Sequence, residues 1–477
     1  MRVDPKNANT MAGDPPGGDA AAPGAAREPL REVPRVIVAC LFIGLAARQA
    51  AFVHRHAINV LYWDQWDFFQ PLFNHQGLWE TFDRQHGPHR EGLGLVLTRA
   101  LAYASGWNSR WDAFAVCALM VGAALMCLIL AARFGIGGRS ILLAAVPLLF
   151  MNTHQYEIYV GAVNLSYAGV PLALFMAFCL SWFARSQAWR LASVAVLTFL
   201  LIFTGFGLFV GVLTPFLLAL EALQAWRARE RRHSLRAALA LLFVCAAWGI
   251  FLHGYTFQPA VEGFRFPYER PVEYVVFIAR MLGHFFGTPL LSPGELAFGL
   301  CVAGALVAIS AWNGIRCALR GVEREPRSVV LFCLASFALL FCINCSVGRA
   351  FTGPIAPYSS RYVALLIPGG VAILLQAAEL SGRRLIFWLA LAFTAFLVPA
   401  TAFPRPYEVW GANWYTEGRR AWKAEYLRTH DEAGADKAAH FPIYPGRLGE
   451  RLRYLEEHGL NLYLPSPDPE PPAAAPR

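Results

Sequence analysis

The sequence predicts an all-α integral membrane protein. Of its 477 residues, 56% are hydrophobic and only 15% are charged, whereas a soluble protein carries about 25% charged residues. The mean hydropathy is +0.41, and apolar runs of roughly 16 to 25 residues recur along the chain, each close to the length that crosses a bilayer. These observations predict a bundle of about 11 transmembrane helices.

Eleven apolar segments account for this bundle. They fall near residues 35–54, 109–131, 140–155, 160–183, 189–204, 206–224, 235–252, 295–317, 328–346, 361–380 and 385–403. Two further segments, 92–105 and 274–290, are short or interrupted by polar residues and glycine. Segments of this length are typical of re-entrant or interfacial helices, so we expect both in outer loops.

The ends of the chain differ from this transmembrane domain, which covers residues 34–403. Residues 1–33 are rich in Pro, Gly, Ala and charge, so a disordered N-terminus is expected. Residues 404–464 are polar and form a small segment outside the membrane, and the proline-rich residues 465–477 are expected to be a disordered tail. Within the polar segment, helical spacing of Leu448, Leu452 and Leu455 predicts a helix that Gly459 ends.

Arginine sets the expected orientation. Cytoplasmic loops concentrate Lys and Arg. With 11 spans and the N-terminus inside, the inner loops are the most basic short loops of the chain: ARFGIGGRS, ARSQAWR, RARERRHSLR, RGVEREPRS and SGRR. Basic residues that are almost all arginine, with abundant Ala and Gly, are typical of a GC-rich bacterial genome. We therefore expect a multi-pass protein of the bacterial inner (plasma) membrane, with a cytoplasmic N-terminus and an extracytoplasmic C-terminus.

In this orientation an acidic pair lies on the outer face. Asp64 and Asp67 stand among aromatic residues in YWDQWDFF, residues 62–69, shortly after the first apolar segment. An aromatic belt at the lipid headgroups explains the rings. It does not explain two acids close to lipid, where charge is costly and marks function. Acids three residues apart would share one face of an interfacial helix.

Other polar residues suited to chemistry lie on the same face. His86, His89, Arg90 and Glu91 in RQHGPHRE could bind a metal or a phosphate, although HxxH without a helix-borne Glu is weak as a zinc signal. Glu157 lies between tyrosines at the end of a span. The stretch GRAFTGPIAPYSSRY brings two arginines that could clamp a phosphate, although snorkelling also explains an arginine at a helix end. Its candidate residues are Arg349, Tyr358, Arg361 and Tyr362.

These motifs resemble a known group of proteins. A first helix, a long outer loop that opens with an acidic pair, a re-entrant helix and a second span near GWNSRWDAF are similar to the GT-C class of membrane glycosyltransferases. That class includes protein mannosyltransferases and aminoarabinose transferases. WDQWDFFQPLF, QHGPHR, QYE, SSRY and LRYLEEHGLNLY resemble, more closely, uncharacterised bacterial membrane proteins of that type over residues 35–465. The chain departs from them at Pro88, where they have an acid.

The resemblance implies an activity. Such enzymes pass sugar from a polyprenyl-phosphate carrier at the outer leaflet to a lipid, glycan or protein acceptor. Asp64 would be the general base, and Asp67 would be a second carboxylate, an orienting group or a ligand of a divalent cation. Arg361 and Arg349 would neutralise the leaving phosphate. His86, His89, Arg90, Glu157, Tyr358 and Tyr362 would complete the substrate site, and the polyprenyl chain would lie near residues 253–259 and 274–290.

Two other functions stay open. A transporter or flippase for a lipid-linked glycan would need charged residues near the membrane midplane and internal repeats. The sequence has no repeat and few charges within the spans. A catalytically inactive scaffold of the same fold is the third alternative, which the departure at Pro88 favours. Membrane lipids are expected partners, and a nucleic acid is not.

Overall fold

The protein folds almost entirely into helices. The computed structural model describes residues 28–136, 141–161, 165–259, 261–380 and 403–465, together with the single positions 388, 392 and 395. Within these ranges the only strands are β1 (Gln85–His86) and β2 (His89–Arg90), an antiparallel hairpin that pairs His86 with His89. Gly87 takes a φ of +56° in the turn, as the first position of a two-residue hairpin turn requires.

Within the described ranges, seven helices are long and apolar enough to cross a membrane. They are α1 (Glu28–His56), α6 (Arg110–Arg133), α11 (Leu208–Arg227), α12 (Arg231–Leu252), α14 (Pro293–Arg320), α15 (Pro326–Arg349) and α16 (Arg361–Glu379). Each matches one of the apolar segments expected from the sequence. The prediction of an all-α membrane protein is therefore confirmed.

The full count of 11 spans is not confirmed. Two of the expected segments form shorter apolar helices, α9 (Val170–Ser181, preceded by the π-helical η3, Leu165–Gly169) and α10 (Gln187–Ile202). The segment expected near 140–155 is broken into η1 (Ile141–Ala144), α7 (Ala145–Phe150), η2 (Thr153–Gln155) and α8 (Glu157–Val160). The break has a local cause, because the Asn152 side chain accepts a 2.7 Å hydrogen bond from His154 N and starts a new turn. The segment near 385–403 lies outside the described residues.

The remaining short helices lie in loops. Two of them, α5 (Gly92–Ser105) and α13 (Val272–Phe285), coincide with the two short apolar segments, and each has 14 residues. The others are α2 (Gln65–Phe68), α3 (Gln70–Phe73), α4 (Leu78–Asp83), η4 (Gly205–Gly207), η5 (Ala350–Thr352) and η6 (Ala356–Tyr358). At the N-terminus, α1 begins at Glu28, inside the segment 1–33 that was expected to be disordered. The rest of that segment and residues 466–477 lie outside the described residues.

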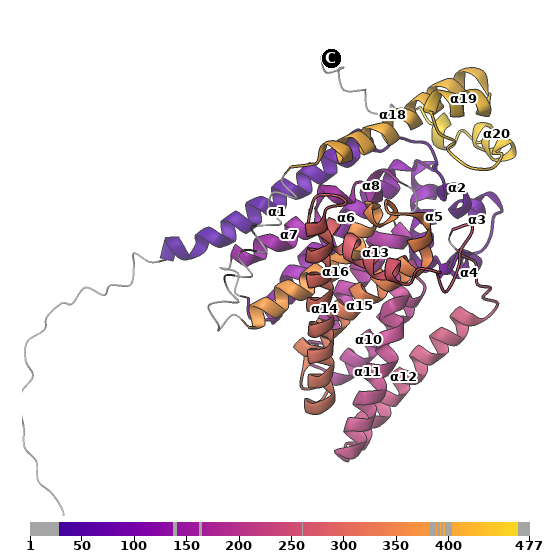
Figure 1. Ribbon diagram of the computed structural model, residues 1–477. Coiled ribbons are helices and arrows are strands. Elements are labelled where there is room, and N and C mark those ends of the chain that lie inside the picture. The colour runs from indigo at the N-terminus through magenta and orange to yellow at the C-terminus, as the bar shows by residue number, and fades with distance from the viewer. Residues whose placement is uncertain are drawn as a thin grey trace, which may run out of the picture.

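The bundle packs around α15 and α16. Both helices are mostly buried, and α15 lies against α11, α13, α14 and α16. Gly299 allows α13 and α14 to approach closely, since a Cβ atom at this position would lie 1.8 Å from Ala279 O. The helices that follow the last described span lie apart from this core, along one end of the bundle (Figure 1).

These last helices form a cap, which we define as residues 403–465. It contains α18 (Pro406–Thr429), α19 (Glu432–Ala439), α20 (Gly449–Glu457) and η7 (Asn461–Tyr463), and α18 runs beside α1 (Figure 1). The helix expected at Leu448 to Leu455 is confirmed, because α20 buries this leucine face and Gly459 follows it with a φ of +61°. The leucines pack with Trp422 against Trp66 and Phe69 of the loop that follows α1.

An asparagine pair fastens the cap to the bundle. Asn461 is buried with a φ of +51°, a conformation that asparagine tolerates better than most residues. Its side chain donates to Asn59 Oδ1 at 3.1 Å and to Trp107 O at 2.7 Å, and its carbonyl accepts from Asn59 Nδ2 at 2.6 Å. The end of the cap is thus tied to the two loops that flank the acidic pair.

Candidate functional site

The two acids of the loop that follows α1 have different surroundings. Asp64 is the N-cap residue of α2, and its Oδ1 lies 3.9 Å from His86 Nε2. About 40% of its side chain is exposed, and no other hydrogen bond or ion pair of its carboxylate occurs within the described chain. The His86 ring packs against Phe68 with a centroid distance of 5.0 Å. Asp64 is therefore an accessible acid beside an imidazole.

Asp67 instead binds the cap. Its Oδ1 accepts a 2.8 Å hydrogen bond from the Tyr444 hydroxyl and lies 3.8 Å from Arg451 Nη1. Asp64 is the N-cap residue of α2 and Asp67 lies in its first turn, but their carboxylates contact different partners. The structure therefore assigns Asp67 a structural contact and leaves Asp64 open.

Glu157 caps helix α16. Its Oε2 accepts hydrogen bonds of 3.0 Å from Arg361 N and from Ser359 Oγ, and its own backbone N donates to Ser360 Oγ at 2.9 Å. A carboxylate at the N-terminus of a helix is stabilised by the positive end of the helix dipole. The Oε2 atom also lies 4.0 Å from Arg361 Nε. Two residues singled out from the sequence 204 positions apart are thereby brought together.

The side chain of Arg361, the first residue of α16, projects toward solvent. About 54% of its side chain is exposed, and its Nε donates to Ser359 Oγ at 3.0 Å. Its two terminal Nη atoms make no hydrogen bond within the described residues. A guanidinium in this state can still bind an anion through two parallel hydrogen bonds.

Tyr167 interacts electrostatically with both Asp64 and Arg361. It lies within electrostatic range of Asp64, Glu91 and Arg361, and its hydroxyl donates a 3.3 Å hydrogen bond to Glu91 Oε1. Glu91 is fully buried, and this burial raises its pKa well above the usual value. The nearby Asp64 adds to the effect, whereas Tyr167 and Arg84 oppose it. Asp64 and Arg361 thus both lie within electrostatic range of Tyr167, which contacts the buried Glu91.

Two residues of α18 complete this region from the cap. Tyr415 packs edge-on against Tyr62 with a centroid distance of 5.8 Å, and the Arg419 guanidinium lies 5.6 Å from the Tyr62 ring centroid. Burial raises the pKa of Tyr415, and Glu157 raises it further, while Arg361 and Arg419 lower it. Arg361 and Arg419 therefore both lower the pKa of the Tyr415 hydroxyl. We call Asp64, Glu157, Tyr167, Arg361 and Tyr415 the outer polar cluster, after the side of the membrane that the sequence predicts for them.

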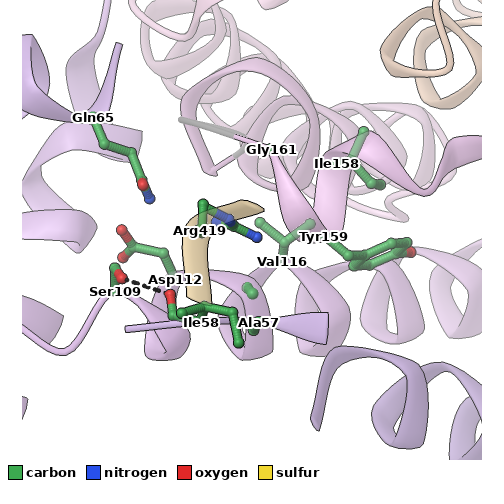
Figure 2. Close-up of a pocket in the computed structure, with 11 residues that line it drawn as sticks. Ala57, Ile58, Gln65, Ser109, Asp112, Val116, Ile158, Tyr159, Gly161 and Arg419 are labelled. Carbon is green, nitrogen blue, oxygen red and sulfur yellow. Dashed lines mark hydrogen bonds between the residues drawn. The ribbon is translucent and has the colours of Figure 1, made fainter. Parts of the chain in front are cut away.

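A cleft is lined by the sequence neighbours of two cluster residues, since Gln65 follows Asp64 and Ile158 follows Glu157 (Figure 2). It is a small hollow, of about 330 Å³ when the adjoining open solvent is included, and its wall includes Gln65, Ser109, Asp112 and Arg419. Asp112 lies in the first turn of α6, and its carboxylate has no hydrogen bond or ion pair within the described chain. Since Gln65 follows Asp64 directly, the cleft and the acidic loop share a wall.

Two predicted site residues, His89 and Arg90, belong to the packing of the hairpin. His89 is buried against Phe206, with a centroid distance of 4.7 Å, and this burial lowers its pKa to about 4. Arg90 donates to Phe251 O at 2.8 Å, to His253 O at 2.6 Å and to Asp83 O at 2.5 Å. Two of its nitrogens therefore hold the hairpin to the end of α12, and the third holds it to Asp83 at the end of α4.

The other predicted residues near Arg361 contact neighbouring helices. The Arg349 guanidinium lies 5.8 Å from the Tyr362 ring centroid. Tyr358 donates a 2.6 Å hydrogen bond to Glu295 Oε2 at the start of α14, and its hydroxyl accepts one of 3.1 Å from Leu291 N. Tyr358 thus faces the turn between α13 and α14, and Arg349 and Tyr362 form a cation–π pair behind Arg361.

The outer polar cluster has no metal-binding geometry among the described residues. His86 and His89 pair across the hairpin, but His86 faces Asp64 whereas His89 is buried. The one group of three metal-ligating side chains within the described ranges lies elsewhere, at Glu230, His233 and Glu323. A divalent cation at the acidic pair stays a prediction.

Four residues of this region were not among the candidates from the sequence. Tyr167, Tyr415 and Arg419 have no local motif, and the contacts that bring them to the site join distant parts of the chain. Asp112 has a signal, because an acid in the first turn of an apolar helix is costly unless it serves a purpose.

Comparison of the chain with protein-family models, with curated proteins and with solved structures finds no match.

Proposed function

We propose that the protein is a membrane glycosyltransferase that moves a sugar from a polyprenyl-phosphate donor to an acceptor of the cell envelope. One observation carries the proposal. Asp64 and Arg361 are both exposed and are within electrostatic range of each other, although 297 positions separate them by their numbering. Transfer at a sugar carbon needs a base for the acceptor hydroxyl and a cation for the departing phosphate, and this pair offers both.

The roles follow from the contacts. Asp64 would accept the proton of the acceptor hydroxyl. Arg361, held by Glu157 and Ser359, would bind the phosphate through its terminal nitrogens. The small cleft lined by Gln65, Asp112 and Arg419 lies beside the loop that carries Asp64, where the sugar would bind at the protein surface. The half-buried aromatic ring of Tyr415 provides a face on which a sugar can pack.

The proposal includes an orientation. With 11 spans and the N-terminus in the cytoplasm, the outer polar cluster and the cap face the outer side of the plasma membrane. The helices α5 and α13 would then be re-entrant or interfacial, and the arginine-rich turns would face the cytoplasm. The acceptor would be a glycan, lipid or protein of the envelope.

Asp64→Asn tests the proposal. The purified protein is placed in lipid vesicles with a panel of polyprenyl-phosphate sugars, and release of polyprenyl phosphate is measured together with sugar transfer to envelope extracts. Loss of a general base costs about 10²- to 10⁴-fold in rate, or about 3 to 5 kcal/mol of barrier. Asp67→Asn is the matched control, with the same change three residues away, and should keep a measurable part of the activity. Equal and near-normal transfer by both variants would show that Asp64 is not the base.

A further inference from the structure

A buried histidine lies between three carboxylates at the end of the bundle away from the cap. His233, in the first turn of α12, has only 7% of its side chain exposed. Its Nε2 lies 2.7 Å from Glu221 Oε1. Its Nδ1 lies 3.1 Å from Glu230 Oε2 and 3.3 Å from Glu323 Oε2. The turn between α11 and α12 lies at the opposite end from α18 to α20 (Figure 1).

Glu221 fixes the orientation of the imidazole. Its carboxylate is buried, with 1% exposed, and Arg190 binds both of its oxygens, one of them at 2.9 Å. This carboxylate can only accept a hydrogen bond, so His233 carries a proton on Nε2. A carboxylate that holds a histidine in this way is the usual support of a metal ligand.

The other ring nitrogen of His233, Nδ1, then has no hydrogen-bond donor among the two carboxylates that face it. With the proton on Nε2, the Nδ1 lone pair of His233 points at two carboxylate oxygens, and all three atoms repel one another unless a cation lies between them. Glu323 Oε1 is already bound by Gln187 Nε2 at 2.9 Å, which leaves Oε2 to face the histidine. Either a metal ion or a second proton on the imidazole would satisfy this arrangement.

We propose that Glu230, His233 and Glu323 bind one divalent cation of the Zn²⁺ type. Their ligand atoms lie within 4.8 Å of one another. Zinc bonds of about 2.0–2.1 Å place tetrahedral ligands about 3.4 Å apart, close to the two distances from Nδ1. With a neutral His233, the three carboxylates and Arg190 sum to a charge of minus two, which a divalent cation cancels. Glu230 and Glu323 are about half exposed, so water can occupy the fourth position.

The bound ion would join two parts of the bundle. Glu230 and His233 belong to the turn between α11 and α12, whereas Glu323 belongs to the turn between α14 and α15. The same turns also meet through Gln224, whose side chain donates to Cys317 O at 3.0 Å and accepts from Val322 N at 2.9 Å. The cation is therefore expected to stabilise the packing of these two hairpins, independently of glycosyl transfer.

Metal binding by the full-length protein tests the inference. The protein is purified in detergent through an affinity tag without histidine, stripped with EDTA and titrated with ZnCl₂ in equilibrium dialysis. Cobalt absorption between 500 and 650 nm reports the ligand set, and melting is followed with and without Zn²⁺. Glu323→Gln and Glu230→Gln are chosen because both side chains are exposed and neither is part of the buried Arg190–Glu221 pair. Glu456→Gln is the control, since Glu456 lies 3.8 Å from His430 in an exposed pair of the cap.

We expect one tight Zn²⁺ per chain, visible cobalt bands and a higher melting temperature with Zn²⁺. Each single variant should bind Zn²⁺ at least about tenfold more weakly, the double variant should lose the site, and Glu456→Gln should bind as the wild type does. Wild-type protein without cobalt bands, or equal Zn²⁺ binding by wild type and double variant, would overturn the inference. Either result would mean that a doubly protonated His233 holds the cluster together.

Discussion

Tyr444 donates a 2.8 Å hydrogen bond to Asp67, which ties the cap to the loop that carries Asp64. This contact separates two acids that look equivalent in the sequence. Asp67 has a partner in the cap, whereas Asp64, three residues before it, remains open to a substrate.

We expect Tyr444→Phe to loosen the cap and to leave the bundle intact. A hydrogen bond to a charged acceptor is worth about 1.5–3 kcal/mol when buried. About 28% of the Asp67 side chain is exposed, so a loss of about 1 kcal/mol is expected. Faster exchange of amide hydrogens in α20 would report it. Tyr463→Phe is the control, because its 3.5 Å bond to Glu456 is exposed, and equal exchange in both variants would contradict the assignment.

Arg361→Lys should impair transfer although the charge is kept. Lysine is a point charge that cannot bind a phosphate in a bidentate manner. Removal of one oriented donor from a transition state costs about 10²- to 10³-fold in rate, and steady-state kinetics with a polyprenyl-phosphate donor would measure it. Arg265→Lys, in an exposed pair with Glu269, is the matched control. A normal rate for Arg361→Lys would exclude a bidentate phosphate clamp.

Glu91→Gln should change how stability depends on pH. Burial raises the pKa of Glu91 in the folded protein, so the folded state binds a proton more tightly than the unfolded state does. The stability that Glu91 gains from this tighter proton binding is fully present at pH values below its pKa in the unfolded state. It is lost as the pH rises through its raised pKa in the folded state. Glutamine imitates the protonated acid at every pH. Melting temperatures from pH 5 to 9 should therefore agree at low pH and diverge at high pH, with the variant more stable; parallel curves would show that Glu91 is ionised.

Asn461→Ala should cost more stability than Asn461→Gly. Both substitutions remove the side-chain bonds to Asn59 and Trp107. Only alanine also strains the left-handed backbone, so losses of about 2 to 4 kcal/mol for alanine and about 1 kcal/mol less for glycine are expected. Protease sensitivity of the cap measures this order. The reverse order would mean that the φ of +51° is not kept in solution.

Reporter fusions test the orientation. A reporter that is active only outside the cytoplasm should be active when it is fused after Ala402 and inactive when it is fused at the N-terminus, because the arginine-rich turns favour the inside. An active cytoplasmic reporter after Ala402 would place the outer polar cluster on the wrong side for a lipid-linked donor.

The sequence predicted the helices better than it predicted the site. Long apolar runs have few alternatives to a helix in lipid, so all seven long helices coincide with expected segments. The broken stretch between Ile141 and Val160 was not predicted, because hydropathy does not register the turn that Asn152 starts. The contact between Asp67 and Tyr444 was not predicted either, because it joins residues 377 positions apart.

The contacts of the cap are beyond the reach of sequence patterns. Tyr415 reaches Tyr62, and Arg419 reaches the carbonyl of His56 at 3.4 Å, 363 positions away. Neither residue has neighbours that mark it for function, and only the packing of α18 along α1 brings them to the site. Glu157 and Arg361, by contrast, could be singled out because each stands at the end of an apolar segment.

The position of α18 in the chain has a consequence for biosynthesis. Tyr415 and Arg419 follow every described span, so they leave the ribosome only after those helices have been made. A nascent chain therefore holds Asp64 and Arg361 without Tyr415 and Arg419 until α18 has been synthesised and has docked beside α1. Assembly of the outer polar cluster is thus among the last events in the maturation of this protein.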